Sequence, residues 1–250
     1  MTQTHRTALV TGASRGIGRA TAARLAADGF RVAAHYGRHA DAAASLVAEL
    51  PGRGHAAFGA DLADAEQVGR LMEQVSAHFG HLDLLVNNAG VFVDHDPNCV
   101  DLATWREAWR RTLAVNLLAA ADLAFHALPN FPEAGGKIIN VSSRGAYRGE
   151  PQSPAYGASK AALNSLTQSL AASLGQRGIV VCGVAPGWVE TDMAAAHLAG
   201  AGGDQIRAQS PLRRVARPSE VANVIAFLAG EDTDYLSGAI IDVNGASYFR

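Results

Sequence analysis

The chain has 250 residues, of which 48% are hydrophobic and 18% are charged, and its formal net charge is -2. This length suits one α/β domain with a large core, and the near-neutral charge argues against binding to nucleic acid or to an anionic membrane surface. The polar start, the lack of a stretch of about 18 apolar residues and two distant cysteines predict a soluble cytoplasmic protein with both cysteines buried and reduced.

Short apolar runs alternate with longer helical patterns along the chain. In order, the residues predict a strand at 7–12, a helix at 17–29, a strand at 31–36, a helix at 40–50 stopped by Pro51 and Gly52, a strand at 55–62, a helix at 64–80, a strand at 82–90, a helix at 102–128, a strand at 136–143, a helix at 155–175, a strand at 178–187, a looser segment at 190–217, a helix at 218–229 and a strand at 238–245.

Mostly apolar strands that are each followed by a helix indicate a parallel sheet with helices on both faces. Right-handed crossovers then give a doubly wound sheet, whose ligands bind beyond the carboxyl ends of the strands. With no internal repeat or linker, we predict an α/β protein with a single Rossmann-like domain over 1–250.

The stretch VTGASRGIG, residues 10–18, follows the first strand and opens the first helix. Gly12 permits a tight turn, Gly16 lets the backbone approach a pyrophosphate, and Gly18 allows close packing of the helix on the sheet. The free N–H groups at a helix start favour an anion. A glycine-rich turn by itself is often only a structural connection, but its place after the first strand favours nucleotide binding.

The end of the second strand indicates which nucleotide is bound. An NAD site usually has an acidic residue there, whereas this region reads AAHYGRHAD and has no Asp or Glu at the strand end. Arg15 and Arg38 are placed to neutralise a 2′-phosphate, which favours NADP(H) over NAD(H). The alternative is that both arginines are solvated surface charges.

Tyr156 and Lys160 are four residues apart in a predicted helix and therefore lie on one face. An ammonium beside a phenol stabilises the phenolate and lowers the pKa of the tyrosine, which makes the pair a usable general acid/base. Ser143 ends the fifth strand at the same sheet edge and has a hydroxyl that can hold a carbonyl oxygen. Asn116 lies within the long helix, where the alternative is a core asparagine satisfied by local backbone.

These motifs together resemble the classical short-chain dehydrogenase/reductase family over essentially the whole chain. The matching residues are Thr11-Gly12-x-x-x-Gly16-x-Gly18, Asp61, Asn87-Asn88-Ala89-Gly90, Asn116, Ser143, Tyr156-x-x-x-Lys160, Pro186-Gly187 and Thr191.

The resemblance implies a hydride-transfer enzyme that interconverts a ketone or aldehyde and an alcohol. It implies that Tyr156 exchanges a proton with the substrate, that Lys160 lowers the pKa of Tyr156 and binds the nicotinamide ribose, and that Ser143 orients the carbonyl. It implies that Asn116 holds a water of a proton relay. The expected cofactor-binding residues are Gly12, Ser14, Arg15, Gly16, Ile17, Gly18, Tyr36, Arg38, Asp61, Leu62, Asn88, Ala89, Gly90, Tyr156, Lys160, Pro186, Gly187, Val189 and Thr191.

The substrate is less well defined by the sequence. Residues 190–217 match the family's mobile substrate lid, and their alanine-rich composition favours a modestly apolar substrate. The C-terminal half resembles the 3-oxoacyl-[acyl-carrier-protein] reductase branch, but the region after Gly90 departs from it. We favour a generic NADPH-dependent carbonyl reductase, with a carrier-protein reductase using Arg110 and Arg111 for docking as the alternative.

A non-catalytic nucleotide-sensing protein is a remote alternative, because all four expected catalytic positions are filled. The resemblance also implies a homotetramer, for which Tyr248 and Phe249 are candidate interface residues. The histidines, among them His35 and His197, have no metal-ligand spacing, so we predict no metal site and assign these histidines no role.

Overall fold

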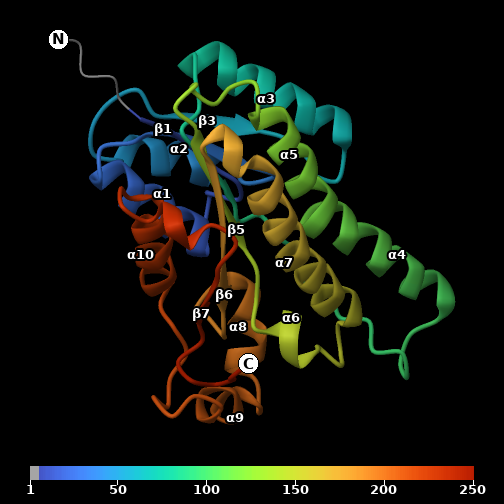
Figure 1. Cartoon of the computed structure of the whole chain (residues 1–250). Helices are drawn as coiled ribbons and strands as arrows, with labels where there is room; N and C mark the ends of the chain where they lie inside the picture. Colours follow the sequence, from blue (N-terminus) through green and yellow to red (C-terminus); the bar gives the residue numbers. More distant parts are fainter. Residues whose placement is uncertain (1–5) are drawn as a thin grey trace.

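The computed structural model describes residues 6–250 and is built around a seven-stranded sheet in which all neighbouring strands run parallel (Figure 1). The strand order is β3-β2-β1-β4-β5-β6-β7, so the chain builds outward in both directions from β1. The predicted doubly wound α/β fold is therefore confirmed. The strands are β1 Thr7–Val10, β2 Arg31–Tyr36, β3 Ala56–Gly59, β4 Leu84–Asn87, β5 Gly136–Val141, β6 Ile179–Pro186 and β7 Ile240–Val243.

Helices cover both faces of this sheet. One face carries α1 Gly16–Ala27, α2 Ala40–Glu49 and α10 Pro218–Ala229. The other face carries α3 Ala65–Phe79, α5 Ala119–Ala127 and α7 Pro154–Leu174. The remaining helices are α4 Leu102–Leu113, α6 Gly145–Arg148, α8 Asp192–Ala199 and α9 Gly203–Ala208, with the short turns η1 Ala114–Leu118, η2 Gly175–Arg177 and η3 Asp234–Leu236.

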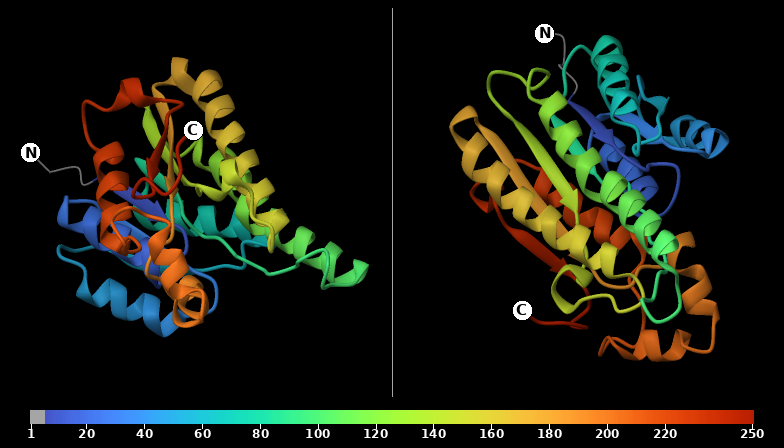
Figure 2. Two further views of the ribbon diagram at one scale, coloured as in Figure 1. Left: turned by 90° about the horizontal axis from the view of Figure 1, so that it is seen from below. Right: turned by 90° about the vertical axis from the view of Figure 1, so that its right-hand side faces the viewer.

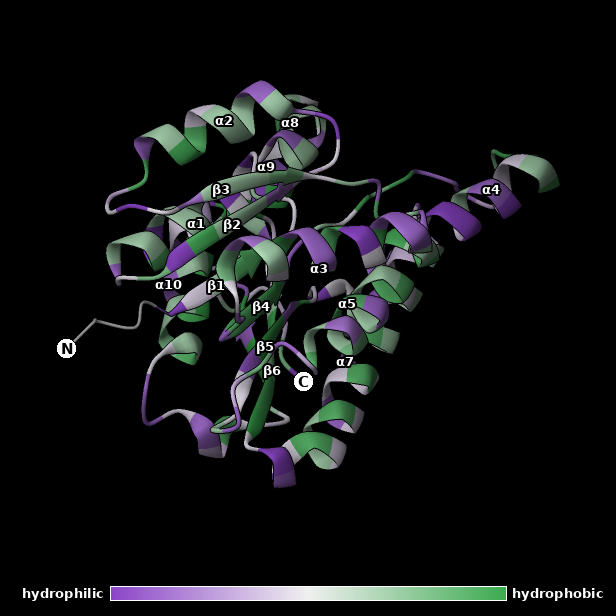
Figure 3. Ribbon diagram, turned by 90° about the horizontal axis from the view of Figure 1, so that it is seen from above, coloured by the Kyte–Doolittle hydropathy of each residue, from purple (hydrophilic) through white to green (hydrophobic). Residues whose placement is uncertain are grey.

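The hydrophobic core forms two layers, one on each side of the sheet. All residues of β1, β4 and β6 are buried, as expected for strands covered on both faces. Figure 3 shows the central strands mostly in green and much of α4 in purple, which matches the partial exposure of that helix. Cys182 lies in this core, but Cys99 is exposed, so the prediction that both cysteines are buried was wrong for Cys99.

The long helix predicted at 102–128 is interrupted. It consists of α4, the π-helical turn η1 and α5, which together form a rod that lies beside α7 (Figure 2). The hydrophobic pattern does not reveal the π turn, because one extra residue shifts the helical register only locally. This turn contains Asn116, and such turns are frequent at functional sites.

The segment 190–217 is more ordered than its sequence suggested. It contains α8 and α9, which gather with α6 at the lower end of Figure 1, beyond the carboxyl ends of the strands. Predicted strands 55–62 and 82–90 are shorter in the structure, at Ala56–Gly59 and Leu84–Asn87. Their last residues leave the sheet because they form the loops that line the cavity described below.

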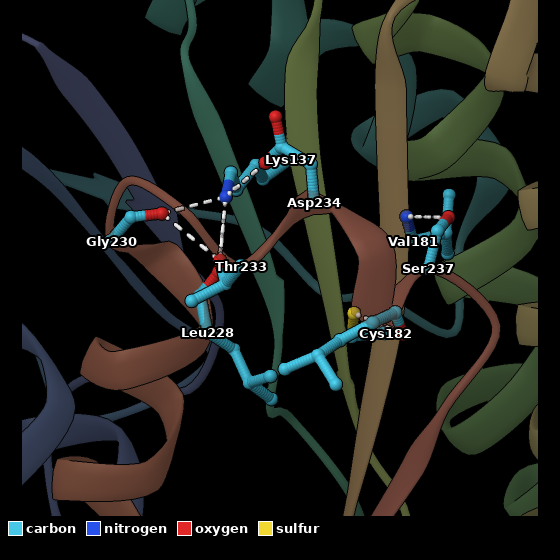
Figure 4. Close-up of polar contacts among 9 residues, drawn as sticks. Lys137, Val181, Cys182, Leu228, Gly230, Thr233, Asp234 and Ser237 are labelled. Carbon is cyan, nitrogen blue, oxygen red and sulfur yellow. Dashed lines mark hydrogen bonds and ion pairs between the residues drawn. The ribbon is translucent and has the colours of Figure 1, made fainter.

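Lys137 joins β5 to the end of α10 (Figure 4). Its ammonium donates to the carbonyl oxygen of Gly230 at 2.7 Å and to Thr233 Oγ1 at 2.8 Å, and it pairs with Asp234 at 2.7 Å. A cation at this position satisfies carbonyl groups that the end of a helix leaves free. Within residues 6–250, no helix is both long and apolar enough to cross a membrane.

Candidate active site

A cavity of ≈ 500 Å³ lies at the carboxyl ends of the strands, between the glycine-rich turn and the start of α7. It brings together most of the residues predicted from the sequence. Those that line it are Gly12, Ser14, Arg15, Gly16, Ile17, Arg38, Asp61, Leu62, Asn88, Ala89, Gly90, Ser143, Tyr156, Lys160, Pro186, Gly187, Val189 and Thr191. Gly18, Tyr36 and Asn116 are the three predicted residues that are not part of its wall.

The glycine-rich turn has the backbone geometry that its sequence requires. Gly12 has φ 64° and Gly16 has φ 55°, which are left-handed values that side chains disfavour. A Cβ on Gly18 would lie 2.2 Å from the carbonyl oxygen of Gly12, so Gly18 lets α1 pack against the turn instead of lining the cavity. Because α1 starts at Gly16, its free N–H groups lie at the wall of the cavity, which fits a nucleotide diphosphate.

Thr11 and Asn88 connect this turn to the loop after β4. The Oγ1 of Thr11 accepts hydrogen bonds from the backbone N–H groups of Asn88 and Ala89, both at 2.9 Å. The side-chain amide of Asn88 donates to the carbonyl oxygen of Thr11 at 2.8 Å. The two loops that face the cavity are therefore fixed relative to each other.

His35 holds the turn from below, a role that the sequence did not reveal. Its Nδ1 accepts from the backbone N–H of Gly12 at 3.1 Å, and its Nε2 lies 3.1 Å from the carbonyl oxygen of Ala60. This pattern requires a neutral ring that donates from Nε2. Burial lowers the pKa of His35 below its ordinary value, which favours the neutral form. A histidine inside an apolar strand has no sequence signal that separates this role from packing.

The end of the cavity beyond β2 is basic. Arg38 is exposed and lines it, and Arg15 lines it while pairing with Asp192 at 3.3 Å. Tyr36 does not contribute, because its ring packs over Gly59, where a Cβ would be 3.0 Å from the ring. Side chains alternate along a strand, and this one does not line the cavity, so a role of Tyr36 in cofactor binding stays a prediction.

Three further side chains line the cavity: Ser143, which follows β5, and Tyr156 and Lys160 in the first turns of α7. Proline at the start of α7 has no N–H to leave unsatisfied, so Pro154 begins the helix and sets Tyr156 and Lys160 on its inner face. Lys160 is 4% exposed, and its ammonium donates to the carbonyl oxygen of Val141 at 2.7 Å. The same nitrogen lies 5.7 Å from the centre of the Tyr156 ring.

The pKa of Tyr156 differs from what the sequence predicted. Burial raises the pKa of Tyr156 to about 12, with a hydrogen bond to Ser143 lowering it and Glu150 raising it. Burial also lowers the pKa of Lys160 to about 8. The desolvation of both groups outweighs the attraction that was expected to lower the pKa of Tyr156. The tyrosine is therefore protonated at neutral pH.

Asn116 clamps the chain beside the cavity. Its amide donates to the carbonyl oxygen of Val91 at 3.0 Å and to Ser159 Oγ at 3.2 Å, and its Oδ1 accepts from the N–H of Val91 at 2.8 Å. Both amide hydrogens are thus used, and one lone pair of Oδ1 remains for a water. A Cβ on Gly90 would lie 3.4 Å from Oδ1 and 3.6 Å from Lys160 Nζ, so glycine leaves space between these two groups.

Aromatic side chains surround Tyr156 on the outer side. Phe92 stands edge-on to the Tyr156 ring with centroids 4.8 Å apart, and His197 lies 5.8 Å from Phe92 and 5.5 Å from Trp188. These three residues, together with Met193 of α8, line the same cavity. None of them was predicted as a site residue. The only signals in the sequence are that Phe92 and Trp188 come just after Gly90 and Gly187, and that Met193 and His197 lie within 190–217.

Comparison with known proteins agrees with this arrangement. The model of the family described as "Enoyl-(Acyl carrier protein) reductase" matches residues 12–246. The chain is 38% identical over 246 residues to the 3-oxoacyl-[acyl-carrier-protein] reductase FabG of Staphylococcus aureus, covering 97% of this chain and 98% of that protein. It is 40% identical over 244 residues to the cis-4-hydroxycyclohexanecarboxylate dehydrogenase of Sinomonas cyclohexanicum, covering 96% and 95%.

A solved structure is similar over nearly the whole chain. It is a short chain dehydrogenase from Burkholderia cenocepacia in complex with NADP, with a TM-score of 0.88 and 38% identity, and the match covers 98% of each chain.

Proposed function

The chain belongs to the short-chain dehydrogenase/reductase family of oxidoreductases, and we propose that it acts as an NADPH-dependent carbonyl reductase on a modestly apolar substrate. The observation that carries this proposal is that Ser143, Tyr156 and Lys160 lie in the same cavity as the glycine-rich turn. The chain thus has a cradle for a dinucleotide beside a proton donor.

Each of these residues has a role that follows from its position. NADPH, when bound, supplies the hydride that reduces the carbonyl carbon. The Ser143 hydroxyl orients the carbonyl oxygen, and Tyr156 donates its proton to that oxygen as negative charge develops there. The raised pKa of Tyr156 keeps this proton in place at neutral pH, as a proton donor requires. Lys160 returns a proton through the space beside Gly90, while Asn116 fixes the wall of that space.

The cofactor preference rests on charge at the end of β2. No carboxylate stands at Tyr36, Gly37 or Arg38, where an NAD enzyme would hold the ribose hydroxyls. Arg38 and Arg15 line the cavity, and a 2′-phosphate would compete with Asp192 for the Arg15 guanidinium. The NADP bound to the similar Burkholderia protein supports the same choice.

A carrier-protein reductase is the second candidate. The FabG similarity favours it, and Arg111 lines the cavity. Arg110, however, is paired with Glu107 at 2.6 Å, which reduces its charge toward a partner. The two relatives named above are called after different substrates, a carrier-bound acyl group and a cyclic hydroxy acid, so the family alone leaves the substrate open.

We also propose that residues 190–217 close over the substrate, and that the protein is a cytoplasmic homotetramer. Large exposed apolar side chains support the tetramer. Leu118 and Phe125 are 56% and 72% exposed on the rod of η1 and α5, while Phe227 and Phe249 are 59% and 81% exposed on α10 and at the chain end. Two self-complementary surfaces generate a tetramer with three two-fold axes.

The test is oxidation of NADPH and NADH, side by side, over a panel of ketones and a 3-oxoacyl carrier protein. We expect turnover with NADPH, and loss of turnover in Tyr156→Phe with cofactor binding retained. Strong preference for NADH would contradict the role of Arg15 and Arg38. Cofactor binding without turnover of any carbonyl would indicate the non-catalytic nucleotide sensor, and much faster reduction of the carrier-bound substrate would establish the second candidate.

A further inference from the structure

Arg144 is a buried cation without a counterion. It directly follows Ser143 and is 4% exposed. Its Nη1 is buried without a hydrogen-bond partner, and no carboxylate of residues 6–250 lies within 4.0 Å of its guanidinium. Burying an unpaired charge is costly, so such a group calls for a ligand or another functional reason.

Among residues 6–250, the side-chain amide of Gln209 is the only acceptor that contacts this guanidinium. Its Oε1 accepts from Arg144 Nη2 and, at 3.2 Å, from Nη1 of Arg148. One neutral oxygen therefore faces two guanidinium groups, which is the position that a carboxylate oxygen would fill with stronger, charge-assisted hydrogen bonds. Gln209 is exposed and lies within 190–217, so its departure would uncover Arg144.

Glu150 forms no ion pair with Arg144, since no carboxylate of residues 6–250 lies within 4.0 Å of that guanidinium. Burial, and then the repulsion of Arg148, lower the pKa of Arg144 to about 10, and the longer-range attraction of Glu150 opposes this without cancelling it. The Arg144 guanidinium thus has no direct counterion and can bind an anion from outside the chain.

A second cavity adjoins the main one at Arg144. It measures ≈ 160 Å³ and is lined by Arg144, Gln209, Ser210 and Trp188, among others. Arg144 and Trp188 also line the main cavity. A substrate with its carbonyl at Ser143 and Tyr156 can therefore extend past Trp188 toward the guanidinium of Arg144.

We propose that Arg144, assisted by Arg148, binds a carboxylate group of the substrate, which displaces the amide oxygen of Gln209. The substrate class is then an oxo acid whose carbonyl is separated from its carboxylate by a short or flat spacer. Planar carboxylates match the fork of a guanidinium, and aromatic Phe92 and Trp188 offer flat surfaces for the spacer. This inference rests on the proposed carbonyl reductase function.

The first test compares 4-acetylbenzoate with its methyl ester, which has the same ketone without the charge. We expect kcat/KM with NADPH to be about 10- to 100-fold higher for the acid, as for a hydrogen bond to a charged group. The acid-to-ester ratio of kcat/KM should fall to near 1 in Arg144→Met. It should stay unchanged in the control Arg53→Met, because Arg53 is exposed and lies outside both cavities. A ratio near 1 in the unmodified protein would overturn the proposal.

The second test measures Tm. Replacing an arginine that only supports the fold would lower Tm, whereas replacing an anion-binding Arg144 should not. Arg144→Met should leave Tm unchanged or higher, since it removes an unpaired buried charge. Gln209→Glu should raise Tm by supplying the carboxylate within the chain, and should reduce the preference for the acid. A lower Tm in Arg144→Met with an unchanged acid-to-ester ratio would show that Arg144 only supports the fold.

Benzoate and inorganic phosphate distinguish the source of the anion. Benzoate should raise Tm in the unmodified protein and not in Arg144→Met. Stabilisation by benzoate with an acid-to-ester ratio near 1 would make this a site for free anions and overturn the substrate assignment, as would a larger effect of phosphate. If neither ketone is reduced while NADPH binds, the proposed function fails, and the effect of benzoate still decides whether Arg144 binds carboxylates.

Discussion

His35 sits beneath the glycine-rich turn and fixes its conformation through a neutral ring. It shows how a residue outside the recognised motifs can control the cofactor site, because it accepts the hydrogen bond from the backbone N–H of Gly12. Burial likewise controls Lys160 and Tyr156, because it sets the pKa values of both groups and so the protonation states from which the reaction starts.

The stability of the protein should depend on the pH through His35. Burial lowers its pKa below the ordinary 6.5, so the unfolded chain binds this proton more tightly than the folded protein. Stability is then fully present above the unfolded pKa and is lost as the pH falls below it. The loss is at most about 1.4 kcal/mol per pH unit, or about 3–6 °C in Tm.

Thermal unfolding between pH 8 and pH 5 measures this dependence. The variant His35→Gln, which keeps a donor and an acceptor but does not titrate, should show a smaller fall in Tm on acidification. An equal fall in both proteins would mean that other groups govern the acid sensitivity.

Lys160→Arg should abolish activity and leave the fold intact. The Lys160 ammonium fits a buried site where it reaches the carbonyl of Val141 at 2.7 Å, whereas a planar guanidinium cannot place one donor at the same point. We expect kcat/KM to fall by about 100-fold or more, the range of general acid/base catalysis. The circular dichroism spectrum is the control, and a folded variant with a tenth of the activity would contradict the assignment.

At the scale of elements, contacts between segment ends hold the site together. The loops after β1 and β4 are joined by Thr11 and Asn88, and the loop after β5 is tied to β6 by the bond from Arg144 N to the carbonyl of Pro186 at 2.9 Å. At the opposite end of β5, Lys137 ties the strand to the end of α10. These hydrogen bonds fix the position of each strand-loop-helix unit relative to its neighbours.

Lys137→Met should destabilise the protein without changing its kinetics. Lys137 is one of two lysines in the chain, and its ammonium donates hydrogen bonds to the carbonyl oxygen of Gly230 and the hydroxyl of Thr233. Its loss should cost about 1.5–3 kcal/mol in urea unfolding, as for hydrogen bonds to a charged group. Asp234→Asn is the matched control and should cost under about 1 kcal/mol, because Asp234 is 72% exposed. Equal effects would mean that the ion pair, not the carbonyl contacts, stabilises this end.

At the scale of the whole molecule, large apolar side chains are exposed at separate places on the surface. Leu118 and Phe125 lie on the rod of η1 and α5, which stands beside α7 in Figure 2, while Phe227 lies on α10 and Phe249 near the chain end. Single exposed hydrophobic residues are common, but a Phe that is 72% exposed on a long helix is typical of a surface that another chain covers.

Light scattering of charged variants tests the tetramer. Phe125→Glu should halve the particle mass by disrupting one interface, and Phe125→Glu combined with Phe227→Glu should give a monomer. A monomeric unmodified protein would contradict the proposed assembly, and a tetramer that tolerates both substitutions would place its interfaces elsewhere.

The sequence by itself determined the α/β class, the order of strands and helices, and most of the residues that line the cavity. Hydrophobic periodicity and glycine spacing are local properties, and they specify strands, helices and the tight turn at Gly12 and Gly16 without knowledge of the rest. The loops at one edge follow from the rule that ligands bind beyond the carboxyl ends of parallel strands.

Only the tertiary structure decided how the side chains are used. The π turn at Asn116, the ring of His35 under Gly12, the outward direction of Tyr36 and the unpaired charge of Arg144 all depend on neighbours far away in the chain. Burial, which sets the pKa values of Tyr156 and Lys160, is likewise a property of the packed molecule. No local pattern contains these features, because desolvation and hydrogen-bond partners are defined only once the segments have come together.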